Sequence, residues 1–272
     1  MAESINTGLK RKGRKIDVKY LALRKIHGRA LKLSNEILTL LRGGYPDGAH
    51  SLWRTLYELE IISHFLVRQD YDVSERYIAH ADMRRYKEAT DYQTYCEKIN
   101  YELLTKEEFL SIKRRAQDLV TKYGGEYYYE RGFEWIPKAI LRDRSFRNLE
   151  EAVGFSHYRP YYNWSSDSIH GGPKGLFALG VLDDLQIETI LIGPSNYGLV
   201  DPMHATALSL LRISLNLLSL NPQSRLECLE DFSLKLVDEL GEKALKIQIH
   251  IEKYESKNPS RQANSPSPPC DK

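Results

Sequence analysis

Apolar residues between positions 16 and 41 recur every three or four positions, which is the period of an α-helix. This spacing places an apolar stripe on one helix face, and the rest of the protein must cover it. Paired glycines and a proline in residues 43–48 then predict the end of the helix, because neither residue type continues a helix cheaply. The stripe is formed by Ile16, Tyr20, Leu23, Ile26, Ala30, Leu33, Ile37, Leu40 and Leu41.

The same period predicts helices along most of the chain. Ser74 is expected to cap one of them, Thr105 with Glu108 to form a capping box, and Asp201 with Pro202 to open another. Only residues 186–192 have the branched apolar run of a strand, and they fit a helix equally well. The expected helices cover 16–41, 49–68, 74–100, 105–124, 148–154, 158–170, 201–220 and 225–255.

The sequence therefore predicts an all-α, multi-helix bundle with an irregular aromatic-rich loop at about 124–147. We expect one helical domain over residues 16–257. Residues 1–15 are expected to form a basic flexible arm, and residues 258–272, rich in serine and proline, a disordered tail.

Composition excludes several classes of protein. With 42% hydrophobic and 28% charged residues, the chain is neither wholly disordered nor fibrous. No stretch approaches the roughly 18 uncharged apolar residues that a membrane helix needs, so no membrane partner is expected. The three cysteines are too few and too scattered for a disulfide framework or a zinc site. A reducing cytoplasm is the simplest location.

The formal net charge of +2 hides an asymmetry, because residues 1–32 hold ten basic residues against two acidic ones. A compact basic arm attracts phosphate-rich partners, above all RNA in a small cytoplasmic protein. A solvated tail followed by a helix with water-facing Lys and Arg explains the same charges. The candidate nucleic-acid-binding residues are Lys10, Arg11, Lys12, Arg14 and Lys15.

Common catalytic motifs are absent from the sequence. It has no phosphate-binding glycine loop followed by Lys and Ser or Thr, no His-Glu-x-x-His, no Cys-x-x-Cys and no Gly-x-Ser-x-Gly. The eight histidines are scattered, and no two of them share a helical turn. We therefore expect no metal and no cofactor.

Two rows of polar residues have helical spacing. Arg54 and Glu58 lie four positions apart, and Tyr162, Ser166 and His170 also step by four. If the rows face each other, Arg54 supplies positive charge for a phosphate, Glu58 orients Arg54, and His170 exchanges a proton near neutral pH. Tyr162 and Ser166 are then supporting hydrogen-bond partners. The alternative is a satisfied polar network that only fixes the register of the helices.

Three pieces of the chain resemble an uncharacterised bacterial family. The first piece, residues 48–58, has small residues followed by an Arg and a Glu on one expected helix. The second, residues 133–135, contains a Trp. The third, residues 158–171, contains the pattern Tyr-x(3)-Ser-x(3)-His-Gly. The arrangement is similar to HEPN-type helical domains, many of which are metal-independent ribonucleases of toxin and antiphage systems. The resemblance covers roughly residues 30–220.

This resemblance implies a helical bundle that dimerises, in which an Arg and a His act on the RNA 2′-hydroxyl and the scissile phosphate. Active HEPN ribonucleases carry both residues on one helix at a shorter spacing than that of Arg159 and His170 here. Arg54 would then supply the charge from another helix or from a facing subunit. The expected function is action on RNA, as a ribonuclease of a toxin or antiphage defence system. The expected partners are a second copy of the chain and a partner protein or antitoxin. The alternative is a non-catalytic protein- or nucleotide-binding module.

Overall fold

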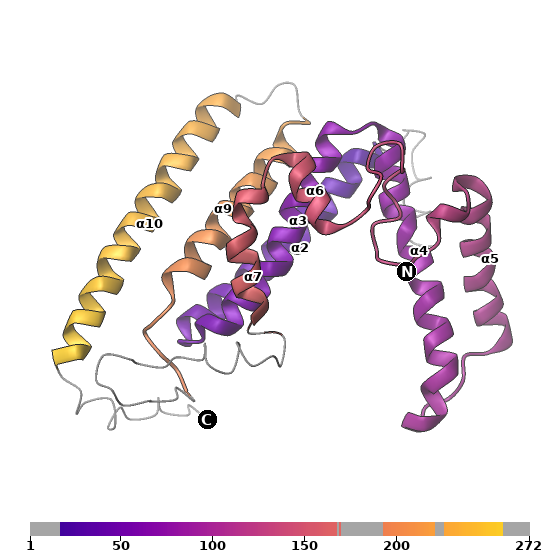
Figure 1. The fold of residues 1–272 in the computed structure, drawn as a ribbon, viewed down its shortest axis with the longest axis horizontal. Helices are drawn as coiled ribbons and strands as arrows, with labels where there is room; N and C mark the ends of the chain where they lie inside the picture. The colour runs from indigo at the N-terminus through magenta and orange to yellow at the C-terminus, as the bar shows by residue number, and fades with distance from the viewer. Residues whose placement is uncertain (1–16, 168, 170–192, 221–225, 258–272) are drawn as a thin grey trace. The chain divides into compact units, whose positions relative to one another are not determined.

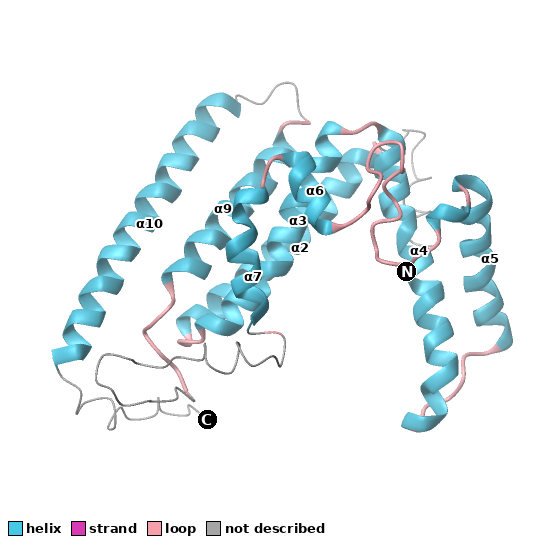
Figure 2. Cartoon of the chain, viewed as in Figure 1, coloured by secondary structure: helices cyan, strands magenta, loops and turns pink. Residues whose placement is uncertain are grey.

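The computed structural model describes residues 17–167, 169, 193–220 and 226–257. Among these residues every regular element is a helix and none is a strand (Figure 2), so the predicted all-α class is confirmed. Short 3-10 helices η1, η2 and η3 cover Cys96–Ile99, Gly125–Tyr127 and Ser156–Tyr158. The α-helices are α2 (Val18–Arg42), α3 (Pro46–Arg68), α4 (Tyr71–Tyr95), α5 (Lys106–Tyr123), α6 (Phe146–Val153), α7 (Arg159–Asp167), α9 (Val200–Leu218) and α10 (Leu226–Lys257).

The chain divides into two compact units. Unit 1 takes the described residues of Met1–His27 and Ile61–His157, and unit 2 takes those of Gly28–Glu60 and Tyr158–Lys272. Helices α2 and α3 contribute residues to both units. The single domain over 16–257 stays a prediction, and the predicted arm (1–15) and tail (258–272) lie outside the described residues.

The predicted break after the first helix is confirmed. Helix α2 ends at Arg42, and Gly44 has a φ of 77°, a conformation that glycine adopts without strain. The Ser195 N–H donates a hydrogen bond to the Gly44 carbonyl at 2.8 Å. Helix α3 begins at Pro46, three residues before the predicted start, because a proline fits the first helical position, where no N–H is needed.

In unit 1, α4 and α5 lie side by side (Figure 1), and the ends of α5 follow the sequence signals. The predicted capping box of Thr105 and Glu108 is confirmed, and the helix stops before Gly124. The predicted Ser74 cap is wrong, because α4 begins three residues earlier and Ser74 is buried inside it. Apolar residues of this unit's core include Leu23, Ile26, Phe65, Met83, Trp135 and Leu149.

The irregular aromatic segment at about 124–147 is confirmed, with η2 as its only regular element before α6 begins at Phe146. Arg76 of α4 fixes this loop: its Nε donates to the Trp135 carbonyl at 3.0 Å. The Arg76 guanidinium lies 4.6 Å from the ring centroid of Tyr123 and 5.0 Å from that of Tyr127. Tyr127 in turn donates its hydroxyl to the Arg76 carbonyl at 2.5 Å. The loop is thus held to α4 by cation–π contacts and hydrogen bonds.

In unit 2, α9 and α10 lie side by side (Figure 1). A Cβ on Gly241 of α10 would lie 2.8 Å from Nε2 of His204, so the glycine permits this close approach. The predicted opening of α9 at Asp201 and Pro202 is wrong, because Leu199 precedes the first helical residue and both predicted residues lie inside the first turn. Among the helices that the structure describes, none is long and apolar enough to cross a lipid bilayer.

Candidate functional site

Arg54, Glu58 and Tyr162 come together in unit 2, and we call them the Arg54 cluster. The Arg54 Nη2 donates to the Tyr162 hydroxyl at 2.7 Å, and that hydroxyl donates to Glu58 Oε1 at 2.6 Å. The Arg54 Nε lies 3.5 Å from the same carboxylate oxygen. The Arg54 guanidinium also lies over the Tyr162 ring, 4.6 Å from its centroid. The two predicted polar rows therefore meet at these three residues.

The cluster is half-buried. The side chains of Arg54 and Glu58 are 25% and 38% exposed, whereas Tyr162 as a residue is only 7% exposed. Burial, together with the neighbouring Glu58, raises the pKa of Tyr162 to about 12, so its hydroxyl keeps its proton at neutral pH. The phenol thus joins the cation and the carboxylate as a neutral hydrogen-bonding group.

The remaining predicted site residues lie elsewhere or outside the described residues. The Ser166 hydroxyl donates to the Tyr162 backbone carbonyl at 2.8 Å, one turn back in the same helix. It therefore supports the backbone of Tyr162 rather than bonding to Arg54 or Glu58. His170, Lys10, Arg11, Lys12, Arg14 and Lys15 all lie outside the described residues.

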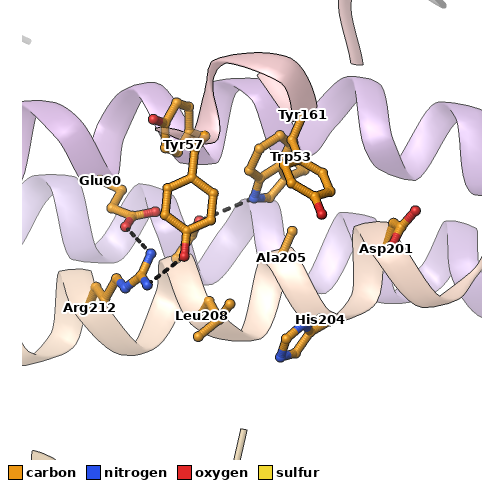
Figure 3. Close-up of a pocket in the computed structure, with 11 residues that line it drawn as sticks. Trp53, Tyr57, Glu60, Tyr161, Asp201, His204, Ala205, Leu208 and Arg212 are labelled. Carbon is orange, nitrogen blue, oxygen red and sulfur yellow. Dashed lines mark hydrogen bonds and ion pairs between the residues drawn. The ribbon is translucent and has the colours of Figure 1, made fainter. Parts of the chain in front are cut away.

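A cavity of about 240 Å³ lies beside this cluster, between α3, α7 and α9, and we call it the aromatic cavity. In Figure 3, Trp53 and Tyr161 lie across from Ala205 and Leu208 of α9. Its lining comprises Trp53, Tyr57 and Glu60 from α3, Tyr158 from η3, Tyr161 from α7, and Asp201, His204, Ala205, Leu208, Ser209 and Arg212 from α9.

A buried ion pair closes one end of the aromatic cavity. Arg212 Nη1 donates to Glu60 Oε1 at 3.1 Å, and Arg212 Nη2 donates to the Tyr158 hydroxyl at 2.8 Å (Figure 3). Glu60 is buried, and this burial raises the pKa of its carboxyl although Arg212 and Ser209 act in the opposite direction. Burial opposes the charge of Arg212, but Glu60 and Tyr158 outweigh that effect and raise the pKa of its guanidinium.

Trp53 forms one wall of the cavity and is held there by contacts with α9 and with Tyr57. Its Nε1 donates to the Ser209 hydroxyl at 3.1 Å, which joins α3 to α9. Its ring stacks on that of Tyr57, with centroids 5.2 Å apart and planes inclined by 26°. Trp53 is 2% and Tyr57 is 1% exposed, so both rings are rigid parts of the core as well as parts of the cavity wall.

The aromatic cavity and the Arg54 cluster share the ring of Tyr57. Its centroid lies 6.1 Å from that of Tyr158, which lines the cavity, and 5.9 Å from that of Tyr162, which belongs to the cluster. Arg54 follows Trp53 in the sequence, and Tyr162 follows Tyr161. The two features therefore occupy neighbouring positions of α3 and α7, with the Tyr57 ring between them.

No motif in the sequence marks the residues that line the aromatic cavity. Glu60 and Arg212 each fall within a predicted helix among apolar neighbours. A charged residue on an apolar stripe is the one local signal that either of them has a special role. The sequence does not indicate that Glu60 and Arg212 are partners, because 152 positions separate them. Within the part of the chain that the structure describes, no three His, Cys, Asp or Glu side chains gather in a way that could hold a metal ion.

Fold and site together define an all-helical protein with a half-buried arginine cluster beside an aromatic cavity. Residues 20–186, more than half of the chain, match the family described as "Family of unknown function (DUF5677)", and the protein belongs to this family. No curated protein matches the chain significantly. No solved structure does so either.

Proposed function

We propose that the protein binds RNA at the Arg54 cluster and cleaves it without a metal ion, as HEPN-type ribonucleases do. The observation that carries the proposal is that Arg54 is both oriented and accessible. Two partners fix its guanidinium, yet a quarter of its side chain remains exposed. A guanidinium held in one orientation at the surface is suited to a phosphate, because its N–H groups match the phosphate oxygens.

Each residue of the cluster has a role in this proposal. Arg54 binds the phosphate, and Glu58 and Tyr162 keep its guanidinium in place. Arg159 adds a second guanidinium, 5.2 Å from the centroid of the Tyr162 ring. His170 is proposed as the general acid and base; it follows Ser166 by four positions in the sequence.

The proposed reaction is an internal transfer of the phosphodiester. The 2′-hydroxyl loses its proton to a base as its oxygen bonds to phosphorus. The bond between phosphorus and the 5′-oxygen breaks, and that oxygen receives a proton from an acid. The products are a 2′,3′-cyclic phosphate and a 5′-hydroxyl, and no water or redox partner is consumed. Arg54 would stabilise the negative charge that develops on the phosphate oxygens.

The test is incubation of the purified protein with RNA in the presence of a chelator. We expect cyclic-phosphate ends from the wild type and a loss of about 10²- to 10⁴-fold in rate for His170→Ala, as for other general acids and bases. Arg54→Ala should lose activity as well. Arg84→Ala is the matched control, because Arg84 and Glu88 form a similar i, i+4 pair on α4 with both side chains at least 60% exposed. Equal degradation by all four proteins would rule out the enzyme.

A second candidate is a non-catalytic module that binds a partner protein or a nucleotide. It is favoured by the completeness of the hydrogen bonding at Tyr162, which both accepts from Arg54 and donates to Glu58. In that case His170→Ala changes no turnover, and Arg54→Ala changes only stability and binding. Thermal unfolding of both variants, measured beside the cleavage assay, separates the two candidates.

The proposed setting is a cytoplasmic toxin or antiphage effector that acts as a homodimer and is restrained by a partner protein. It rests on the likeness to HEPN-type domains described from the sequence. Light scattering on the purified full chain tests the dimer. A monomer at micromolar concentration would contradict it.

A further inference from the structure

We infer that the aromatic cavity binds a single nucleobase, so that one nucleotide is held by its base in the cavity and by its phosphate at Arg54. This inference rests on the proposed RNA binding and adds to it a base-recognition site that the sequence did not indicate. Three features of the cavity support it, namely its aromatic walls, its buried ion pair and its position beside the Arg54 cluster.

The walls of the cavity are suited to a flat ring. Four aromatic side chains contribute to them, namely Trp53, Tyr57, Tyr158 and Tyr161. Tyr161 is 40% exposed whereas Trp53 is 2% exposed, so Tyr161 stands at the entrance and the buried rings lie deeper. A volume of about 240 Å³ is below the roughly 300–1,000 Å³ of pockets that hold drug-sized ligands. One heteroaromatic ring system fits this description better than a larger molecule.

The charged groups at one end of the cavity are already paired with each other. Arg212 lines the cavity and is held there by Glu60 and Tyr158. Because Glu60 offsets the charge of Arg212, this end of the cavity offers a ligand hydrogen-bonding groups rather than a net charge. A neutral ring with hydrogen-bonding edges suits it. Asp201, eleven residues before Arg212 on α9 and exposed, can accept from the N–H groups of a base.

The position of the cavity favours a nucleotide over an unrelated aromatic compound. In both α3 and α7 a residue of the Arg54 cluster directly follows a residue that lines the cavity. The Tyr57 ring lies close to the Tyr158 ring of the cavity and to the Tyr162 ring of the cluster. A base stacked against Tyr161 would therefore leave its sugar and phosphate near Arg54. Stacking of bases on aromatic side chains is the usual way in which proteins bind single-stranded RNA.

The first experiment titrates the full chain calorimetrically with the four ribonucleosides, which carry no phosphate. We expect at least one to bind, and Tyr161→Ala to weaken that binding by about 5- to 150-fold, the range of base stacking on an aromatic side chain. Tyr95→Ala is the matched control, since Tyr95 is 55% exposed and lies in unit 1. Ala205→Phe, which fills the cavity from its α9 wall, is a second variant that leaves Tyr161 in place and should also abolish binding.

The second experiment separates this inference from the proposed function. An RNA tetramer and an abasic oligomer of equal length and charge are compared. We expect the wild type to prefer the RNA and Tyr161→Ala to bind both equally. Equal binding of both oligomers by the wild type, or no nucleoside binding, would overturn the base site while leaving phosphate binding at Arg54 intact. Conversely, nucleoside binding that depends on Tyr161, with RNA affinity unchanged in Arg54→Ala, would support the base site and refute the proposed role of Arg54.

Discussion

Arg212 of α9 donates a hydrogen bond to Glu60 of α3 at 3.1 Å, and the Glu60 side chain is only 1% exposed. A buried carboxylate of this kind tolerates its charge only beside a cation. The pair also closes one end of the aromatic cavity, so the same contact stabilises unit 2 and shapes its candidate site.

Replacing Arg212 by Leu should lower the free energy of unfolding by about 3–5 kcal/mol, because Glu60 then stays buried without its cation. Urea denaturation measures the change. The exposed pair of Lys243 and Glu239 on α10 supplies the control, and Lys243→Ala should change stability by less than about 0.5 kcal/mol. Similar small effects for both variants would show that the Glu60–Arg212 pair contributes little.

The same pair predicts a dependence of stability on pH. Burial raises the pKa of Glu60 above its ordinary value of 4.5, so the folded state holds this proton more tightly than the unfolded chain. Stability from this group is therefore greatest at low pH and falls as pH rises through the range above 4.5. In Arg212→Leu the fall should be steeper, since the opposing effect of Arg212 on that pKa is gone. Unfolding of both proteins between pH 4 and 7 tests the sign, and parallel curves would contradict it.

Tyr162→Phe should lower the free energy of unfolding by about 1–2 kcal/mol, because the hydroxyl that joins Arg54 to Glu58 is lost. RNA affinity should fall too, since Arg54 loses one of the two groups that orient it. Tyr161→Phe, on the same helix but at an exposed position, should leave stability unchanged. Binding and unfolding measured on both variants check the two effects, and a Tyr162→Phe protein indistinguishable from Tyr161→Phe would argue against the network.

His80 predicts acid sensitivity of unit 1. Burial lowers the pKa of His80 to about 4, even though Glu134 lies 3.6 Å away and acts in the opposite direction. The unfolded chain, with a pKa near 6.5, binds the proton more readily, so stability is full above pH 6.5 and is lost as pH falls toward 4. The loss amounts to about 3 kcal/mol. His80→Phe should flatten the pH curve of unfolding, and a variant that loses stability between pH 6.5 and 4 as the wild type does would contradict this role of His80.

The basic residues of the arm predict salt-sensitive RNA binding. Each phosphate contact to single-stranded RNA contributes about 0.7 to the slope of log affinity against log salt. Deleting residues 1–15, which removes Lys10, Arg11, Lys12, Arg14 and Lys15, should reduce the magnitude of that slope by up to about 3.5 if all five contact phosphates. Filter binding of labelled RNA at several salt concentrations measures it. An unchanged slope would assign RNA binding to the remaining residues alone.

Features that depend on neighbours in the chain were predictable. The end of α2 before Gly43, the capping box of Thr105 and Glu108, and the stop of α6 before Gly154 all follow from local backbone chemistry. The pairing of Arg54 with Glu58 follows from the four-residue period of one helix. The Ser74 cap failed because several polar residues precede α4, and a local pattern does not choose among them.

The sequence by itself thus determined the helices, their faces and the pairing of Arg54 with Glu58 on one helix, because these depend on contacts three or four residues apart. Only the tertiary structure decided that Tyr162 completes this cluster, that Glu60 meets Arg212, and that Trp53 bonds to Ser209. These partners lie 108, 152 and 156 positions apart. Which helix faces pack together is set by side-chain packing across the whole unit, and no local period records it.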